Sequence, residues 1–153
     1  MAIKKKIKSN KARVAIVASS FNDFITKRLL AACLLELKLS GVAGNQVTTV
    51  WVPGAFEVPL AALKLALRRD IDAVICLGAV LRGETYHFEV VANEAARGIM
   101  EASLHSAKPV MMGVLTADTA AQAMARSHTR GGTNKGRDCA RSVLEMIALL
   151  KKI

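Results

Sequence analysis

Four short apolar segments, rich in β-branched residues, alternate along the chain with longer segments whose apolar residues recur every three or four positions. The short segments predict strands at residues 13–19, 46–52, 72–80 and 109–116. Their centres are almost continuously apolar, as in DAVICLGAV, which is typical of strands buried on both faces. Because alternating strands and helices form parallel sheets covered by helices, the sequence predicts a three-layer α/β/α fold with a four-stranded parallel sheet.

The longer segments predict helices. Two apolar faces are expected to point into the core: one carries Ile25, Leu29, Leu30, Cys33 and Leu37, and the other carries Phe56, Leu60, Leu63 and Leu67. A third helix is predicted from near His87 toward His105, and a short helix over residues 118–126 that opens with a capping-box pattern. The last helix is predicted after Asn134, with Cys139, Val143, Met146 and Leu150 on its apolar face.

Charge is concentrated at the start of the chain. Of the formal net charge of +10, residues 1–13 carry six lysines and arginines and no acid. We therefore expect a flexible basic arm at residues 1–12, followed by a single domain at 13–153. RNA binding by the arm is one alternative, although one Trp, one Tyr and four Phe supply few rings for base stacking.

Cysteine usage and hydropathy bear on the cellular setting. Cys33, Cys76 and Cys139 lie in apolar segments without the spacing of metal ligands or short disulfide loops, so buried thiols are expected. This usage favours a reducing compartment, and we expect a cytoplasmic protein. No apolar run has the length of a membrane span, and the N-terminus does not resemble a signal peptide.

Ligands of open parallel sheets bind beyond the carboxyl ends of the strands. That rule directs attention to residues 19–22, 53–57, 81–87 and 112–118. In the third of these segments, Thr85 is expected as a helix N-cap, and the N–H groups that follow it could receive a phosphate or simply begin the helix. His87 follows in the first turn, where a histidine can exchange protons near neutral pH.

The other segments allow both structural and ligand-binding interpretations. VPGAFEVP, residues 52–59, predicts a rigid turn. Phe56 could stack on a planar ring or be the first core residue of the following helix, and Glu57 could accept hydrogen bonds or favour the helix N-terminus. Phe21 and Asn22 have the same ambiguity. RSHTRGGTNKGR, residues 126–137, could recruit an anion. The chain lacks the P-loop, the dinucleotide-binding glycine motif, the G-x-S-x-G elbow and the H-E-x-x-H metal motif.

Four motifs, taken in order along the chain, resemble lumazine synthases of riboflavin biosynthesis: SFNDFIT, VPGAFEVP, GAVLRGETYHFEVV and GVLTADTAAQA followed by NKG. The resemblance spans most of the chain and implies a flavodoxin-like strand order, 2-1-3-4. It implies condensation of 5-amino-6-(D-ribitylamino)uracil with 3,4-dihydroxy-2-butanone 4-phosphate to 6,7-dimethyl-8-ribityllumazine, phosphate and water. No cofactor or metal is expected for this chemistry.

The resemblance also assigns roles to residues. His87 matches the proton-transferring histidine. The expected contacts of the ribitylaminouracil are Phe21, Ala55, Phe56, Glu57, Ala79, Val80, Leu81 and Met112, where Met112 replaces a residue that is commonly Phe in the family. The butanone phosphate is expected against Glu84, Thr85 and Arg126, with Asn22, Lys135 and Asp138 in support.

The family's sites are shared between neighbouring subunits of a pentamer, so the resemblance implies a homopentamer in which Arg126 and Lys135 serve a neighbour's His87. Riboflavin synthase is a further candidate partner, whereas nucleic acid and membrane are not expected. The stretch from Arg126 to Asn134 is one residue longer than the R-x-G-x-K-x-G-N-K-G form of sixty-subunit capsids, which favours free pentamers. A non-catalytic flavin- or lumazine-binding module is the alternative function.

Overall fold

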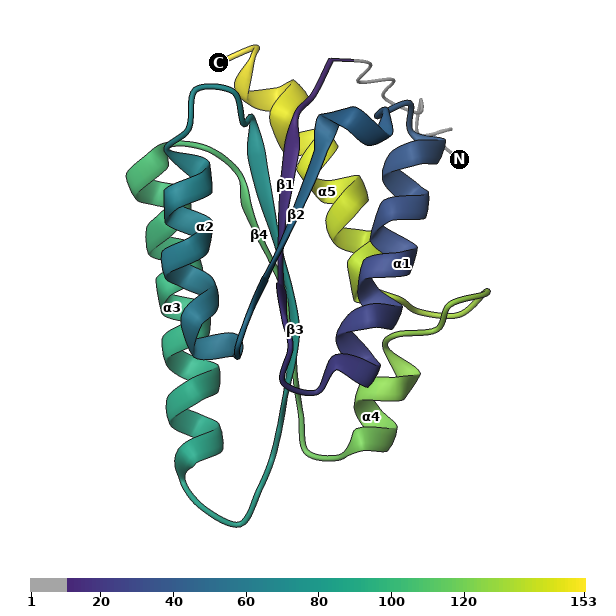
Figure 1. The fold of residues 1–153 in the computed structure, drawn as a ribbon, viewed down its shortest axis with the longest axis vertical. Helices are drawn as coiled ribbons and strands as arrows, with labels where there is room; N and C mark the ends of the chain where they lie inside the picture. Colours follow the sequence, from purple (N-terminus) through teal and green to yellow (C-terminus); the bar gives the residue numbers. More distant parts are fainter. Residues whose placement is uncertain (1–10) are drawn as a thin grey trace.

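The computed structural model describes residues 11–153, and it has one four-stranded parallel sheet within that range. The elements, in chain order, are β1 (Val14–Ser19), α1 (Asp23–Leu39), the 3₁₀ turn η1 (Gly44–Gln46), β2 (Val47–Val52), the 3₁₀ turn η2 (Ala55–Glu57), α2 (Val58–Ala66), β3 (Ala73–Leu81), α3 (His87–Ser106), β4 (Val110–Ala117), α4 (Ala120–Ala125) and α5 (Lys135–Leu150) (Figure 1). Every predicted strand lies within one residue of an observed one. The expected basic arm at residues 1–12 lies almost wholly outside the described residues.

The strands are ordered β2-β1-β3-β4, and all neighbouring pairs are parallel. This order confirms the predicted fold class and the flavodoxin-like arrangement. The order reverses between β1 and β3, which pair with Val14 opposite Ala73 and Ala18 opposite Leu77. All carboxyl ends therefore meet at one edge of the sheet, at the lower end of Figure 1, away from the C-terminus.

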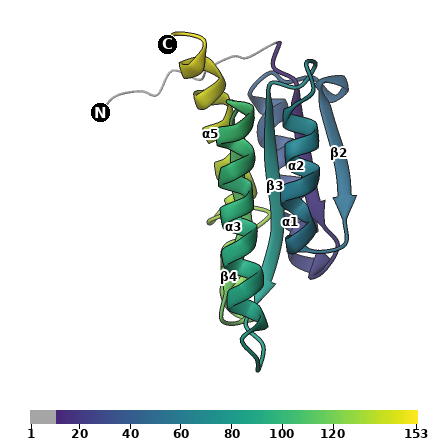
Figure 2. The ribbon, with the colours of Figure 1, turned by 90° about the vertical axis from the view of Figure 1, so that its left-hand side faces the viewer.

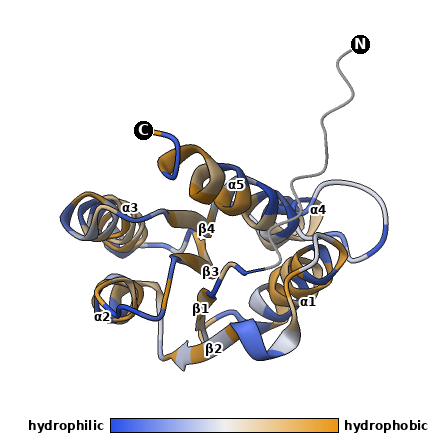
Figure 3. Cartoon of the chain, turned by 90° about the horizontal axis from the view of Figure 1, so that it is seen from above, coloured by the Kyte–Doolittle hydropathy of each residue, from blue (hydrophilic) through white to orange (hydrophobic). Residues whose placement is uncertain are grey.

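The two faces of the sheet have separate cores. One core joins β1 and β3 to α1, α4 and α5 through side chains such as Ile16, Leu29 and Val143. The other joins the opposite face to α2 and α3 through side chains such as Val17, Val58 and Ile99. Seen from above, α2 and α3 lie on one side of the sheet and α1, α4 and α5 lie on the other (Figure 3), and Figure 2 shows α2 and α3 running alongside one another.

Hydrogen-bonding side chains and one glycine set several helix boundaries. Asn134 caps α5, because its Oδ1 accepts from the backbone N–H groups of Gly136 at 2.9 Å and Arg137 at 3.1 Å. Thr119 caps α4 by accepting from the Gln122 N–H, as the capping-box pattern predicted. At the end of α1, Gly41 has φ of 90°, a backbone conformation that favours glycine, and Val42 N–H donates to the Leu37 carbonyl.

Two apolar faces differ from the prediction. In and just before α2, the residues that face the core are Ala55, Val58, Ala62, Leu65 and Ala66, whereas Phe56, Leu60 and Leu67 are exposed by 56%, 68% and 54%. The predicted stripe was therefore wrong at these three positions, whereas Leu63, its fourth member, is partly buried against this core. In α5, Cys139 and Val143 are buried as predicted, but Leu150 is exposed and Ile147 takes the buried position.

Strand β2 also departs from the expectation of burial on both faces. It lies at the edge of the sheet, and Thr48, Thr49 and Trp51 are exposed. The three cysteines are free and buried, as predicted. Burial raises the pKa of the Cys139 thiol to about 11 and raises the pKa values of Cys33 and Cys76 further. Nowhere in residues 11–153 is a helix long and apolar enough to cross a bilayer.

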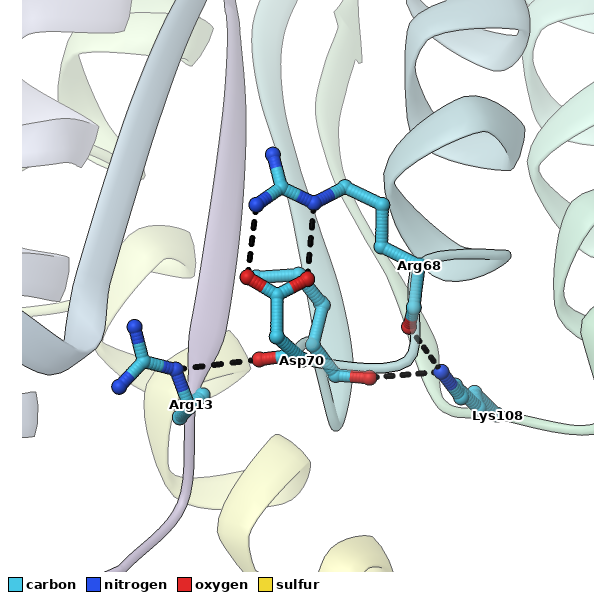
Figure 4. A network of polar contacts seen from close by, with 5 residues as sticks. Arg13, Arg68, Asp70 and Lys108 are labelled. Atoms are coloured by element: carbon cyan, nitrogen blue, oxygen red, sulfur yellow. Dashed lines mark hydrogen bonds and ion pairs between the residues drawn. The ribbon is translucent and has the colours of Figure 1, made fainter.

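A polar network ties the loops together at the amino edge of the sheet (Figure 4). Arg68 forms a two-pronged ion pair with Asp70, and Arg13 Nε donates to the Asp70 carbonyl oxygen at 3.1 Å. Lys108 Nζ donates to the carbonyl oxygens of Arg68 at 2.6 Å and Ile71 at 2.7 Å. These contacts hold the starts of β1, β3 and β4 together, which leaves the carboxyl edge for a site.

Candidate active site

A cavity of about 750 Å³ opens at the carboxyl edge of the sheet. Its walls come from the connections that follow β1, β2 and β3, and from the first turns of α3. The residues that line it are Phe21, Asn22, Pro53, Gly54, Ala55, Phe56, Glu57, Ala79, Val80, Leu81, Gly83, Thr85, His87, Phe88, Val90 and Val91. Three of the four segments that the strand-end rule selected therefore meet in one place, and a cavity of this size suits a small molecule.

The connection after β1 is anchored to its neighbours by hydrogen bonds. Phe21 N–H donates to the Pro53 carbonyl at 2.9 Å, and Asn22 Nδ2 donates to the Ala79 carbonyl at 2.9 Å. Asn22 has φ of 59°, a conformation that Asn tolerates better than most side chains. The Phe21 ring is 72% exposed and lines the cavity, so it is available to stack on a planar ligand.

The connection after β2 forms the next wall. Pro53 and Gly54 precede η2, and Glu57 N–H donates to the Gly54 carbonyl at 3.2 Å. Ala55 is buried while the Phe56 ring is mainly exposed. Phe56 is therefore not a core residue, because more than half of its surface is exposed. It lines the cavity, as the ligand-binding interpretation requires.

The connection after β3 brings the polar groups of the site. His87 is the first residue of α3, as predicted, but the N-cap is Tyr86 and not Thr85. Thr85 lies one residue further out, because the helical turn begins later than the capping pattern suggested. Its hydroxyl still accepts from the His87 N–H at 3.4 Å. The cavity thus contains an imidazole at the N-terminus of a 20-residue helix and the hydroxyl of Thr85 beside it.

Arg82, the first residue after β3, is held by two acids. Its Nε donates to Asp118 Oδ1 at 2.7 Å, and its NH1 pairs with the Glu89 carboxylate. Hydrogen bonds to Asp118 and Glu89 raise the pKa of Arg82, and the bond from Arg82 lowers the pKa of Glu89. Arg82 does not line the cavity, but its guanidinium lies 4.3 Å from the centroid of the Phe88 ring, which does.

Five predicted site residues do not line this cavity. They are Glu84, Met112, Arg126, Lys135 and Asp138. Met112 lies inside β4 opposite Cys76, and Arg126 ends α4 with its NH1 bonded to the Gln122 carbonyl at 2.9 Å. Lys135 and Asp138 lie in the first turn of α5, which covers the other face of the sheet from α3. Within this chain, the predicted basic residues are therefore separate from the cavity that His87 lines.

Sequence reasoning missed Phe88, Val90 and Val91 as lining residues. A signal was available, because they belong to the same first turns of α3 as His87. Val90 and Val91 lie three and four residues after His87, so they share its face of the helix and continue the cavity wall. The pairing of Arg82 with Asp118 had no such signal, since it joins residues 36 positions apart.

The strand order defines a flavodoxin-like α/β protein. The cavity, with its apolar walls, the Glu57 carboxylate and the His87 imidazole, defines a small-molecule site at the carboxyl ends of the strands. Comparisons with known proteins narrow this class. Residues 11–151 match the family model described as 6,7-dimethyl-8-ribityllumazine synthase. A protein of that name from Protochlamydia amoebophila (strain UWE25) is 47% identical over 150 residues, which cover 98% of this chain and 87% of the relative.

The chain belongs to the 6,7-dimethyl-8-ribityllumazine synthase family. The resemblance carried by the four sequence motifs is thereby confirmed, and this family consists of transferases of riboflavin biosynthesis.

Proposed function

We propose that this chain condenses 5-amino-6-(D-ribitylamino)uracil with 3,4-dihydroxy-2-butanone 4-phosphate to 6,7-dimethyl-8-ribityllumazine, releasing phosphate and water. The observation that carries the proposal is the cavity in which exposed Phe21 and Phe56 rings, Glu57 and His87 meet. Family membership supports the same reaction. The substrates supply the amine, the carbonyl and the leaving group, so the protein's task is to orient them and move protons.

Each wall of the cavity has a role in this proposal. Phe21 stacks on the pyrimidine ring, and the backbone of Ala79, Val80 and Leu81 borders the ring. The turn Ala55-Phe56-Glu57 holds the ribityl chain, with the Glu57 carboxylate accepting from its hydroxyls. Imine formation and phosphate elimination both require proton transfer. His87 is the first residue of α3 and lines the cavity, where it can serve both steps.

The phosphate requires cations that this cavity lacks within the described residues, since no lysine or arginine lines it. Thr85 and the N-terminus of α3 supply neutral donors. We propose that Glu84 lies beside the phosphate and that Arg126, supported by Lys135 and Asp138, reaches the phosphate from a neighbouring subunit. Met112 then borders the ring pocket of that neighbour. The separation of these residues from His87 within one chain supports a shared site in a homopentamer.

Exposed apolar side chains support an oligomer. Leu60 of α2, Leu67 just after it, and Met100 and Leu104 of α3 are exposed by more than half, and Trp51 is exposed on the edge strand β2. Exposed apolar side chains that gather on neighbouring elements mark interaction sites. Free pentamers, a cytoplasmic location and riboflavin synthase as a partner complete the proposal, and the buried free thiols support a reducing setting.

The test is an assay with both substrates that follows lumazine fluorescence. We expect product from the two substrates together and none from either alone. His87→Ala should lower kcat by about 100-fold, the low end for loss of an acid–base group, because orientation by the cavity remains. Ligand binding without turnover in the unaltered protein would instead identify a non-catalytic flavin- or lumazine-binding module.

Mixed pentamers test whether the site is shared. Arg126→Ala should weaken use of the phosphorylated substrate by about 1.5–3 kcal/mol, the contribution of a charged hydrogen bond. If His87 and Arg126 act from different subunits, co-refolding His87→Ala with Arg126→Ala should create about a quarter of intact sites and raise activity well above that of either parent. Activity no greater than the mean of the parents would place both residues in one subunit's site or remove Arg126 from its role.

A further inference from the structure

The connection between β3 and α3 carries the polar groups of the site, yet its side chains have little support from the core. The side chains at residues 82–87 are all exposed. Gly83 has open space around it, since nothing lies within 4 Å of where a Cβ would be. A segment of this kind is expected to be mobile unless specific contacts hold it, and a shift of about 1 Å in a catalytic group can lower a rate by two orders of magnitude.

Arg82 joins the two ends of this connection to each other and to the end of β4. Its backbone N–H donates to the Ala117 carbonyl at 3.0 Å, which extends the pairing of β3 with β4 by one residue. Its side chain then reaches Glu89 in the first turn of α3 and Asp118 beyond the end of β4. The guanidinium also lies over the Phe88 ring, 4.3 Å from its centroid. Phe88 and Glu89 are the two residues that follow His87.

We propose that Arg82 is a positioning residue for His87. The side chain ties the first turn of α3 to the end of the sheet, and so fixes where the His87 imidazole lies relative to Phe21 and the strand ends. The proposal rests on the proposed function, because it assigns a purpose to the orientation of His87. A planar guanidinium suits this role, since it can pair with two carboxylates and stack on a ring at once, whereas a lysine ammonium cannot.

Direct binding of the substrate phosphate by Arg82 is the competing role. Two carboxylates already face its guanidinium, at Asp118 and Glu89, and they offset the charge that an anion would require. The side chain is also absent from the cavity wall. The contacts of Arg82 therefore favour positioning of His87 over binding of the anion.

The first experiment compares Arg82→Gln and Arg82→Lys with a matched control. Arg97 is the control, because it also pairs with two glutamates, Glu94 and Glu101, on the exposed surface of α3, and it does not line the cavity. We expect Arg82→Gln to lower kcat about 10-fold with both KM values within about 2-fold, Arg82→Lys to restore part of kcat, and Arg97→Gln to leave kcat unchanged. A selective rise in KM for the phosphorylated substrate would overturn the proposal.

The second experiment is a double-mutant cycle with His87→Ala. If Arg82 acts through His87, Arg82→Gln should change kcat by less than about 2-fold once the imidazole is gone. Equal effects of Arg82→Gln in the presence and absence of His87 would show that Arg82 acts elsewhere, and would sink the proposal.

A measurement without turnover separates this proposal from the proposed function. The Val90 N–H donates to the Tyr86 carbonyl at 3.3 Å in the first turn of α3, so its hydrogen exchange reports on the order of that turn. We expect exchange at Val90 and Val91 to rise at least about 5-fold in Arg82→Gln and to stay unchanged in Arg97→Gln. Unchanged exchange in Arg82→Gln would contradict the positioning role even in a protein that forms no lumazine, whereas an inactive unaltered protein with this exchange pattern would contradict only the reaction.

Discussion

Asn22 shows how one residue links the fold to the site. It precedes α1 with φ of 59°, and its side-chain amide donates to the Ala79 carbonyl at the end of β3. The residue thereby joins the connection after β1 to the strand that leads toward His87. Phe21 lies immediately before it, so the position of the exposed Phe21 ring depends on this turn. Asn22, which was predicted as a support for the ligand, therefore supports the backbone of the cavity wall.

Two substitutions at Asn22 separate these contributions to stability. Asn22→Ala loses the hydrogen bond and places an unsuited side chain at positive φ, so we expect the free energy of unfolding to fall by about 2–3 kcal/mol. Asn22→Gly also loses the hydrogen bond but adopts the positive φ without strain, which offsets the added flexibility of the unfolded chain, and it should cost about 1 kcal/mol. Urea denaturation of both variants measures the difference. Equal losses would show that the backbone conformation contributes nothing.

Helices α2 and α3 pack against each other, and Gly98 of α3 allows their close approach. A Cβ at Gly98 would lie 2.6 Å from Cβ of Pro59 and 2.7 Å from its Cγ. The buried face of α2, built from small residues such as Ala62 and Ala66, is consistent with this close packing. Pro59 lies in the first turn of α2, two residues after Glu57, the last residue of η2 and a residue of the cavity wall.

Gly98→Ala should therefore be destabilising despite the better helix propensity of alanine. We expect a net loss of about 1–2 kcal/mol in the free energy of unfolding, because the added methyl group must displace Pro59. Gly44→Ala is the control, since nothing lies within 4 Å of the place its methyl group would occupy, and it should be close to neutral. Urea denaturation tests both variants. A Gly98→Ala protein as stable as the unaltered one would mean that α2 moves away freely.

At the scale of the whole molecule, a polar network and the candidate site lie at opposite ends of the strands. The Arg68–Asp70 pair and Lys108 hold the loops at the amino edge (Figure 4), while the cavity occupies the carboxyl edge. Some acids at each end of the strands are paired with cations, among them Asp70 and Glu89. Hydrogen bonds from Lys27, Arg68 and Arg82 lower the pKa values of Asp23, Asp70 and Glu89, respectively, so each carboxylate stabilises the folded state in its charged form.

These shifts predict how stability depends on pH. Because the folded pKa values are lowered, the contribution is complete above the ordinary values of 3.8 for aspartate and 4.5 for glutamate, and it is lost as the pH falls through the lower folded values. We expect the free energy of unfolding to be nearly constant between about pH 5 and 7 and to decrease below about pH 4, with a smaller decrease in 1 M salt. Denaturation series at each pH test this, and greater stability at pH 3 than at pH 6 would contradict it.

The prediction from sequence was most successful where local patterns decide structure. The alternation of apolar strands with helical periodicity determined the fold class, because a strand buried on both faces must be continuously apolar whatever its neighbours are. The same patterns located the ends of the strands, and with them Phe21, Ala55, Phe56, Glu57, Thr85 and His87 as residues of one cavity. The four motifs, in their order along the chain, were also sufficient to identify the family.

Only the tertiary structure decided which faces are buried and which side chains meet. The spacing of large apolar residues marks a helical stripe but not its partner, so Phe56, Leu60 and Leu67 are exposed while Ala62 and Leu65 are buried against α3 and the sheet. The contacts of Arg82 require the ends of β3 and β4 and the start of α3 in one place, which no local pattern encodes. The separation of Arg126 and Lys135 from His87 has the same origin, because the parallel sheet places α4 and α5 on the face opposite α3.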